Sequence, residues 1–138
     1  MNSNKTPQEI VELMMAEDAL SNWLGIEVVS VGPGRCVASM TVREEMVNGF
    51  RIAHGGITFS LADSAFAFAS NSHGRKSMSI ECSINHLSQV NIGDRLTAVA
   101  TESSISNKLG VYHVEVTDQE DKKVALFKGV VYRTSSIW

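Results

Sequence analysis

The stretch from residue 54 to residue 70, HGGITFSLADSAFAFAS, constrains the fold more than any other part of the chain. It contains no proline, and most of its residues favour or tolerate a helix. Apolar side chains fall on every side of that helix, so we expect the rest of the chain to wrap around it. A sheet that curls over the helix is the economical way to do so.

Asp63 is the only charged residue in this helix. An isolated carboxylate in apolar surroundings is costly unless hydrogen bonds or a pKa shift compensate. Two interpretations stay open. Asp63 is either a structural acid, at a seam of the helix or capping a neighbouring amide, or a catalytic acid or base.

The preceding residues, His54, Gly55 and Gly56, favour catalysis. A helix N-terminus offers unpaired N–H groups and a partial positive charge that suit a developing oxyanion, and glycine allows close approach. Gly56 and Asp63 are seven positions apart, about 10 Å along a helix axis, so one helix does not bring both groups to one atom. We therefore predict a homodimer whose antiparallel central helices share the active sites.

Length and composition indicate one globular domain, 1–138, whose first 22 residues form an N-terminal helical segment. The net charge is −3 and no basic cluster occurs, which argues against nucleic acid or an anionic membrane surface as a partner. The N-terminus lacks the pattern of a signal peptide, and no apolar run reaches about 18 residues. We expect a soluble, cytoplasmic protein.

Cap and turn residues divide the remaining chain into elements. Thr6-Pro7-Gln8-Glu9 predicts the start of a helix that ends near Ser21 or Asn22. Gly74 is expected to end the central helix, and 44–53 is expected to be a loop. Turn signals and alternation predict six strands, the last four in a meander: 26–31, 35–42, 77–85, 96–105, 111–117 and 124–133. The fold class is thus α+β, an antiparallel sheet of about six strands around one long helix.

The strand at 77–85 alternates clearly. Met78, Ile80, Cys82 and Ile84 are predicted on one face and the serines, Ser79 among them, on the other. Cys82 and Cys36, the other cysteine, are expected to be reduced core residues.

Several catalytic and cofactor motifs are absent from the sequence. It has no G-x-S-x-G elbow, no P-loop and no dinucleotide fingerprint. The four histidines and two cysteines lack the spacings typical of zinc sites. We expect no metal and no cofactor.

Asn48, His54-Gly55-Gly56 and Leu61-Ala62-Asp63-Ser64, followed by 65–71, resemble the hotdog-fold acyl-CoA thioesterases of the PaaI type, the phenylacetate-degradation subfamily. The likeness extends from about residue 23 to residue 133. The resemblance implies a hotdog fold and hydrolysis of acyl-CoA thioesters at a dimer interface, with dimers commonly pairing into tetramers. Phenylacetyl-CoA and hydroxyphenylacetyl-CoA are the first substrates to expect, with other aryl or medium-chain thioesters next.

The resemblance also implies roles for individual residues. Asp63 would act as general base or as nucleophile, and Gly55 or Gly56 would polarise the thioester carbonyl with a backbone N–H. Asn48 and His54 would position the thioester or the water.

Supporting and binding residues complete the predicted site. Ser64 would help to orient it, and Ser79 would support the attacking water. Phe50 and Phe59 are candidates to line the acyl pocket. Basic residues at a subunit edge would meet the phosphates of coenzyme A, the candidates being Lys108, Arg75, Lys76 and Arg133.

Two other classes of function remain open. One is an acyl-CoA hydratase or dehydratase on the same scaffold, which would depend on a histidine such as His54 paired with an acid. The other is a non-catalytic module that binds acyl thioesters or aromatic acids.

Overall fold

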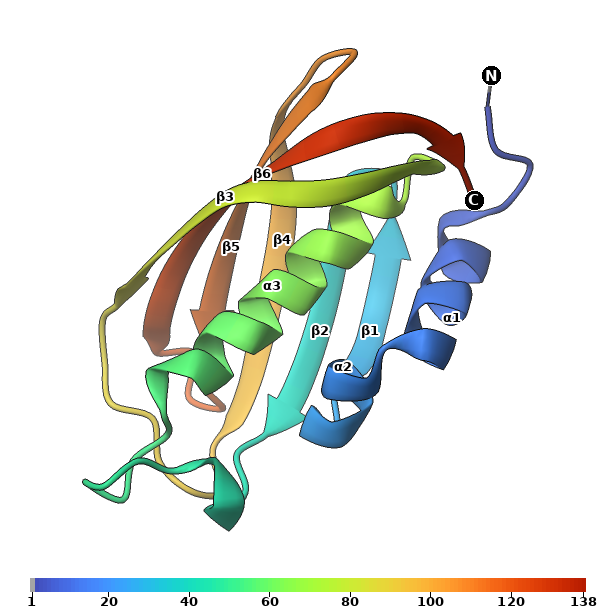
Figure 1. Ribbon diagram of the computed structural model, residues 1–138. Helices are drawn as coiled ribbons and strands as arrows, with labels where there is room; N and C mark the ends of the chain where they lie inside the picture. Colours follow the sequence, from blue (N-terminus) through green and yellow to red (C-terminus); the bar gives the residue numbers. More distant parts are fainter. Residues whose placement is uncertain (1) are drawn as a thin grey trace.

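A six-stranded antiparallel sheet curls around one long helix in the computed structural model, which describes residues 2–138 (Figure 1). The central helix α3 spans Gly55–Asn71, and two shorter helices, α1 (Pro7–Glu17) and α2 (Ala19–Leu24), lie beside it. The predicted α+β architecture is confirmed. The strands are β1 (Glu27–Gly32), β2 (Arg35–Thr41), β3 (Arg75–His86), β4 (Arg95–Ile105), β5 (Leu109–Thr117) and β6 (Lys123–Ile137), with a 3₁₀ turn at Glu44–Met46.

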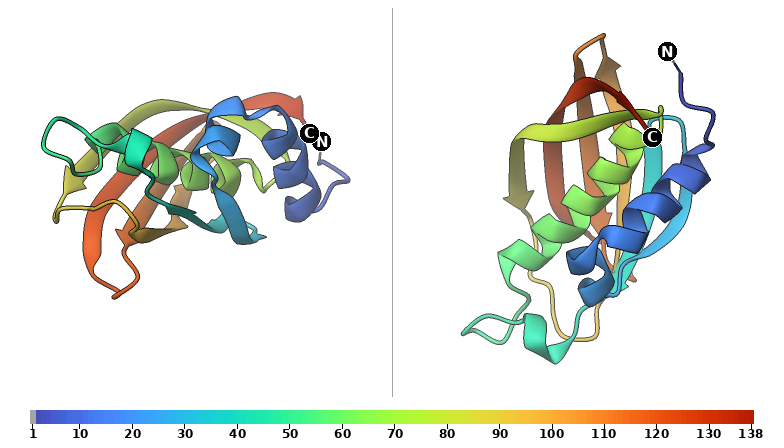
Figure 2. Two further views of the ribbon diagram at one scale, coloured as in Figure 1. Left: turned by 90° about the horizontal axis from the view of Figure 1, so that it is seen from below. Right: turned by 45° about the vertical axis from the view of Figure 1, so that its right-hand side comes forward.

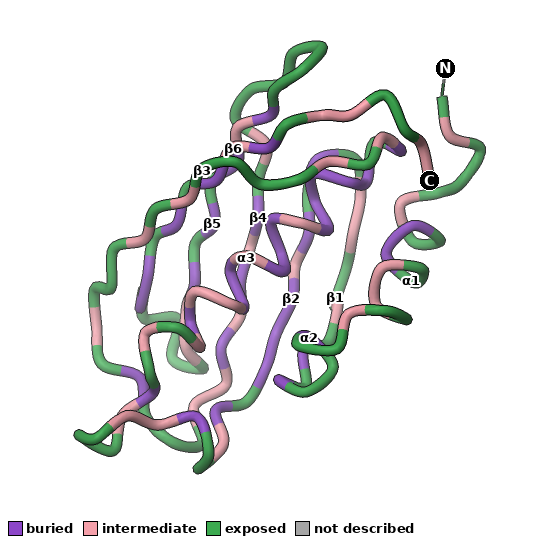
Figure 3. The backbone as a smooth tube through the Cα atoms, in the orientation of Figure 1, coloured by how far each residue is buried: buried purple, intermediate pink, exposed green. Residues whose placement is uncertain are grey.

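The strand order is β1-β2-β4-β5-β6-β3, so the predicted meander of the last four strands is wrong. Only β4, β5 and β6 form a meander, and β3 pairs with the outer side of β6. Alternate residues of β4 are fully buried, which suits a central strand. Most residues of β3 are exposed, which suits an edge, as the exposed trace of β3 shows (Figure 3).

A β-bulge in β3 changes which side chains face α3. The register shifts between Ser79 and Glu81, which leaves Ile80 as the extra residue. Ser79 pairs with the buried Val131 and therefore shares the inner face of the sheet with Cys82. The predicted alternation, with Ser79 and Cys82 on opposite faces, is wrong because period-2 counting holds only up to a bulge.

The core fills the space between α3 and the concave face of the sheet (Figures 1 and 2). Phe66 of α3 packs edge-on against Tyr112 of β5 and tilted against Phe127 of β6. The inner positions of β2 and β4 are mostly small, such as Ala38 and Ala98, which brings the helix close to the sheet.

One stripe of α3 lacks cover. Gly56 is exposed, and Ser60, Asp63 and Ala67 are only partly buried, while the other faces of the helix pack against the sheet and the N-terminal helices. These four positions follow helical spacing and form one continuous line. The expected wrapping is therefore complete except along the line that carries Asp63.

The N-terminal segment forms two helices rather than the predicted one. α1 begins at Pro7 after the Thr6 cap, as predicted. Asp18 then leaves the helical conformation, with φ −87° and ψ 85°, and its carboxylate caps α2 by accepting from the N–H of Ser21. α2 ends at Leu24, and the left-handed Gly25 terminates it. No helix within residues 2–138 has the length and apolar character needed to cross a membrane.

Gly129 of β6 provides a test of the core. A Cβ placed there would lie 2.6 Å from Cζ of Phe66, a buried ring. Gly129→Ala should lower the free energy of unfolding by about 1 to 3 kcal/mol, the range for overpacked cores, although alanine is ordinarily no worse than glycine in a strand. Urea denaturation measures the change.

Gly32→Ala is the matched control, because no atom lies within 4 Å of its added Cβ. We expect it to change stability by less than about 0.5 kcal/mol. Equal stability of the two variants would contradict the packing described for Phe66.

Candidate active site

Asp63 lies half-buried on the uncovered stripe of α3. Within residues 2–138 its carboxylate accepts no hydrogen bond. Burial raises the pKa of this carboxyl above its ordinary value, and the negative charge of Asp18 raises it further. The two causes favour the protonated acid, so Asp63 binds a proton more tightly than an exposed aspartate does.

Asp18 belongs to a hydrogen-bonded chain that joins α2 to α3. The Ser21 hydroxyl donates to Oδ2 of Asp18 at 2.6 Å, and it lies 2.7 Å from the hydroxyl of Ser64. Ser21 has one hydroxyl proton, so the Ser64 hydroxyl must donate to Ser21. Ser64 therefore contacts α2, although it follows Asp63 in the sequence.

The inner face of β3 supplies polar groups near Asp63. The Ser79 hydroxyl lies near the thiol of Cys82 and lowers the pKa of that thiol. Burial raises the pKa of Cys82, and so does the negative charge of Asp63. Cys82 is thus half-buried beside the site rather than in the core, whereas Cys36 is fully buried and its pKa is raised to about 12.

The two glycines at the N-terminus of α3 differ in whether their backbone N–H groups are hydrogen-bonded. His54 caps the helix, and its Nδ1 accepts from the N–H of Gly56 at 3.3 Å. The N–H of Gly55 has no partner among the described residues. A Cβ at position 55 would lie 3.1 Å from Nε2 of His86, so glycine also leaves room for that ring. Gly55 is the better-placed donor for an oxyanion.

Asn48 organises the loop that leads into α3. Its Oδ1 accepts from the N–H groups of Phe50 and Ile52 at 2.9 and 3.4 Å. Its side-chain NH₂ makes no hydrogen bond within residues 2–138. Asn48, Gly55 and His86 all line one cavity of about 430 Å³.

The other predicted residues differ in how near they lie to Asp63 and Gly55. Phe59 is one helical turn from each of them on α3, whereas Phe50 and Lys108 lie outside the helix. Phe50 is 86% exposed on the loop that Asn48 organises. Phe59 packs edge-on against Phe127, with ring centroids 5.4 Å apart, at the border of the core. Lys108 lies in the turn between β4 and β5.

Sequence reasoning missed Asp18 and His86 as neighbours of the site. The position of Asp18, three residues before Ser21, is a cap pattern that could have been recognised. Asp18 lies close to Asp63, and His86 close to Gly55, because of tertiary packing. The local sequence around these residues does not indicate either contact. No cluster of histidine, cysteine and acidic side chains suited to a metal occurs in residues 2–138.

Gly55 and Asp63 of one chain are separated along the helix. Eight residues of continuous helix correspond to about 12 Å along the axis. Within residues 2–138, the unpaired N–H of Gly55 and the carboxylate of Asp63 in one chain therefore lie apart.

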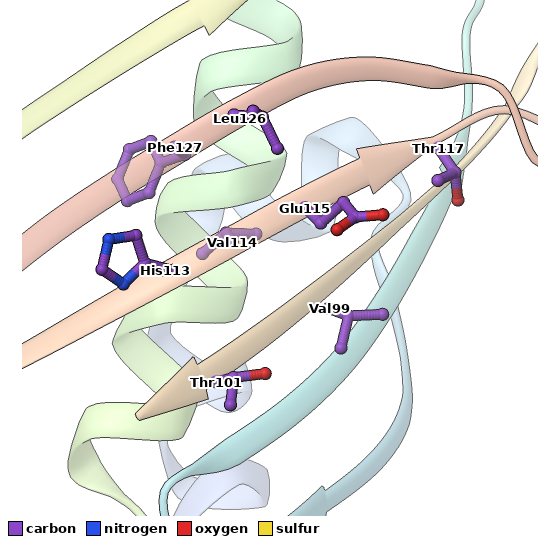
Figure 4. Close-up of a pocket in the computed structure, with 8 residues that line it drawn as sticks. All are labelled: Val99, Thr101, His113, Val114, Glu115, Thr117, Leu126 and Phe127. Carbon is purple, nitrogen blue, oxygen red and sulfur yellow. The ribbon is translucent and has the colours of Figure 1, made fainter. Parts of the chain in front are cut away.

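A further cavity, of about 370 Å³, lies on the outer face of the sheet (Figure 4). Val99, His113 and Glu115 line it, on the side away from α3. None of the predicted site residues is among its lining residues.

Known proteins resemble the chain over most of its length. The acyl-coenzyme A thioesterase PaaI of Escherichia coli K12 is 42% identical over 87% of this chain and 86% of its own. The structure of the E. coli PaaI protein from the phenylacetic acid degradation operon matches with a TM-score of 0.93 and 39% identity, over 95% of both chains. A hypothetical thioesterase protein with coenzyme A, from Streptococcus pneumoniae TIGR4, matches with a TM-score of 0.85 and 25% identity, over 91% of this chain and 98% of that chain.

The model of the thioesterase superfamily matches residues 50–125, the segment that contains α3 and its glycine pair. The resemblance read from the motif residues is thereby confirmed. With its PaaI-type hotdog fold, the chain belongs to the thioesterase superfamily.

Proposed function

We propose that this protein hydrolyses acyl-CoA thioesters to the free acid and coenzyme A, with aryl-acyl groups such as phenylacetyl or hydroxyphenylacetyl as its substrates. The observation that carries the proposal is the half-buried carboxylate of Asp63, which lacks a hydrogen-bond partner in the described chain and has a raised pKa. The name of the E. coli relative and the coenzyme A in the S. pneumoniae structure support the thioester as substrate.

Asp63 can drive hydrolysis in either of two ways. As a general base it takes a proton from water while the water oxygen bonds to the carbonyl carbon. The tetrahedral intermediate then collapses, the C–S bond breaks, and the thiolate of coenzyme A receives the proton. As a nucleophile Asp63 first displaces the thiolate to form a mixed anhydride, which water then cleaves.

The Gly55 N–H is the proposed donor to the carbonyl oxygen. It is unpaired among the described residues and lies at the positive end of α3, where negative charge is stabilised. His54 holds Gly56 in place through its Nδ1, and the free amide NH₂ of Asn48 can donate to the substrate in the same cavity.

A complete site needs two copies of the chain. The Gly55 N–H of one subunit would face Asp63 of the partner subunit across antiparallel α3 helices, with the uncovered stripes in contact. This assembly is a homodimer with two sites, and a dimer of dimers is the tetramer that the resemblance implies. The small residues on the stripe allow the two helices to approach closely.

The remaining site residues would act around this pair. Ser79 faces α3 next to Cys82 and is positioned to support the attacking water. Ser64 would orient the site indirectly, by fixing α2 against α3. Phe59, at the border of the core, is the proposed wall of the acyl pocket, and the exposed Phe50 would reach a substrate only across the dimer.

Asp63→Asn tests the proposed chemistry. Thiol release from a panel of aryl- and alkyl-CoA thioesters should fall by about two orders of magnitude or more, the scale for losing an acid–base group. Hydration of an enoyl-CoA without thiol release, retained by this variant but lost in His54→Ala, would favour a hydratase-type site. A folded parent protein that binds thioesters and hydrolyses none would be a binding module, and the proposal would be wrong.

The same variant should be more stable than the parent above the ordinary aspartate pKa. The folded state holds the proton of Asp63 more tightly than the unfolded chain does, so the parent loses stability as the pH rises from the ordinary aspartate pKa to the raised pKa of the folded state, and the loss is complete above it. Melting temperatures at about pH 8 should favour Asp63→Asn, and the difference should disappear near pH 3.

Subunit mixing tests the shared site. Gly55→Pro removes the N–H at the first helical position, where proline fits the backbone, and Gly55→Ala is its control because it adds a Cβ beside His86 but keeps the N–H. A mixed dimer of Gly55→Pro with Asp63→Asn carries one intact site and one doubly altered site. Re-equilibrated equal mixtures of the two inactive variants should regain about a quarter of the parent activity. No recovery in a mixture that exchanges subunits would place each site within one chain.

Asp18→Asn should lower the pKa of Asp63, because it removes a negative charge that raises it. The amide oxygen can still accept from Ser21, so the cap of α2 is retained. The acidic limb of the plot of kcat/KM against pH should move to lower pH. Glu12→Gln removes a charge from the exposed side of α1 and should leave the limb in place; an equal shift in both variants would contradict a specific effect of Asp18.

A further inference from the structure

The end of β3 brings a histidine to the N-terminus of α3. His86 is the last residue of β3 and pairs with Ala125 of β6. Ala125 is fully buried on the inner face of the sheet, and residues directly opposite each other share one face, so His86 lies on the side that α3 occupies. In Figure 1, the end of β3 and the start of α3 lie at the same end of the molecule. The fold thus places an imidazole next to Gly55, whose N–H is unpaired within residues 2–138.

The inner face of β3 follows α3 from Asp63 to Gly55. Cys82, Ile84 and His86 alternate along this face. Cys82 is close enough to Asp63 for the charge of the carboxylate to act on its thiol. His86 is four residues further along the strand, or about 13 Å, and lies beside Gly55. This spacing matches the separation of about 12 Å between Gly55 and Asp63 along α3, so a side chain of β3 accompanies each of the two groups.

The imidazole of His86 and the N–H of Gly55 can reach the same atom. Nε2 of His86 lies 3.1 Å from the point that a Cβ of residue 55 would occupy. That point is about 2.5 Å from the backbone nitrogen of the same residue, so the two nitrogens are at most about 5.6 Å apart. Two donors that each hold one oxygen at about 2.9 Å can be separated by up to about 5.8 Å. One carbonyl oxygen between them can therefore accept from both.

The His86 side chain is available to a ligand. Within residues 2–138, neither of its ring nitrogens forms a hydrogen bond or an ion pair. His86 is exposed and lines the cavity of about 430 Å³ that Asn48 and Gly55 also line. Among the described residues that line this cavity, no other side chain is titratable and none is a carboxylate. An imidazole with its proton on Nε2 is a donor without net charge, and no acceptor of the described cavity occupies it.

We propose that His86 donates from Nε2 to the carbonyl oxygen of the bound thioester, beside the N–H of Gly55, an inference that rests on the proposed function. Negative charge develops on this oxygen when the carbonyl carbon is attacked, and a donor already in position stabilises that charge. The oxygen becomes a carbonyl oxygen again when the C–S bond breaks, so His86 keeps its proton throughout. Because no acid of residues 2–138 pairs with His86, it is not arranged as the acid-paired histidine of a hydratase.

His86→Phe removes the donor and keeps a flat ring at the same place. For an aryl-CoA thioester, kcat and kcat/KM should fall together by about a hundredfold, the scale for one donor to an oxyanion, with little change in KM. His86→Gln should retain more activity, because its amide NH₂ can still donate. His113→Phe is the matched control, since this exposed histidine lies on the outer face of the sheet, and it should behave as the parent. An unchanged kcat in His86→Phe, or equal losses in the two phenylalanine variants, would overturn the proposal.

A ketone analogue of the thioester separates this inference from the proposed function. A methylene group between its carbonyl and its sulfur prevents cleavage, and the ¹³C resonance of its carbonyl carbon moves downfield as donors polarise the bond. The bound ketone should show the downfield shift in the parent and in His113→Phe, and a smaller shift in His86→Phe. A parent that shows the shift but hydrolyses no thioester would refute only the proposed function. Equal shifts in the three proteins, or no binding of the ketone by the parent, would overturn the role of His86.

Discussion

The structure depends on the burial of α3, a helix that is apolar on nearly every side. A curled sheet covers most of it, and α1 and α2 cover another side, so the strand order and the N-terminal helices both serve the same requirement. Along the line through Gly56 and Asp63, the rest of the single chain does not bury α3 completely. The part of α3 that is not fully buried is also the part that carries the Asp63 carboxylate.

Asp63 shows how that environment alters a common side chain. Burial among apolar groups penalises its charge, and Asp18 adds a second penalty through its own charge. The Asp18 carboxylate is held in position by Ser21, whose hydroxyl also accepts from Ser64, the neighbour of Asp63 in sequence. The packing of α2 on α3 thus fixes the electrostatic surroundings of the acid, and a contact that stabilises the fold also tunes the site.

The sequence predicts the features that local patterns determine. The long helix, six strands and the isolated Asp63 follow from spacing and residue type, and the structure has them. The position of β3 and its bulge do not follow, because one extra residue at Ile80 reverses the alternation and carries no signature in a run of serines and apolar residues. Contacts across the fold, such as that between His86 and Gly55, depend on the register of distant strands. Local periodicity in the sequence does not predict these contacts.

The rigidity of α3 has a consequence for the assembly as a whole. A continuous helix holds Gly55 and Asp63 of one chain at a fixed separation, so no local motion brings the donor and the carboxylate together. If the proposed chemistry uses both groups, the second copy is part of the site and not only of the quaternary structure. The same contact that would bury the uncovered stripe would then complete the site. It would also shield Asp63 from bulk solvent and reinforce the burial that already raises its pKa. In the proposed dimer, the association of the two chains and the activation of the acid are a single physical event.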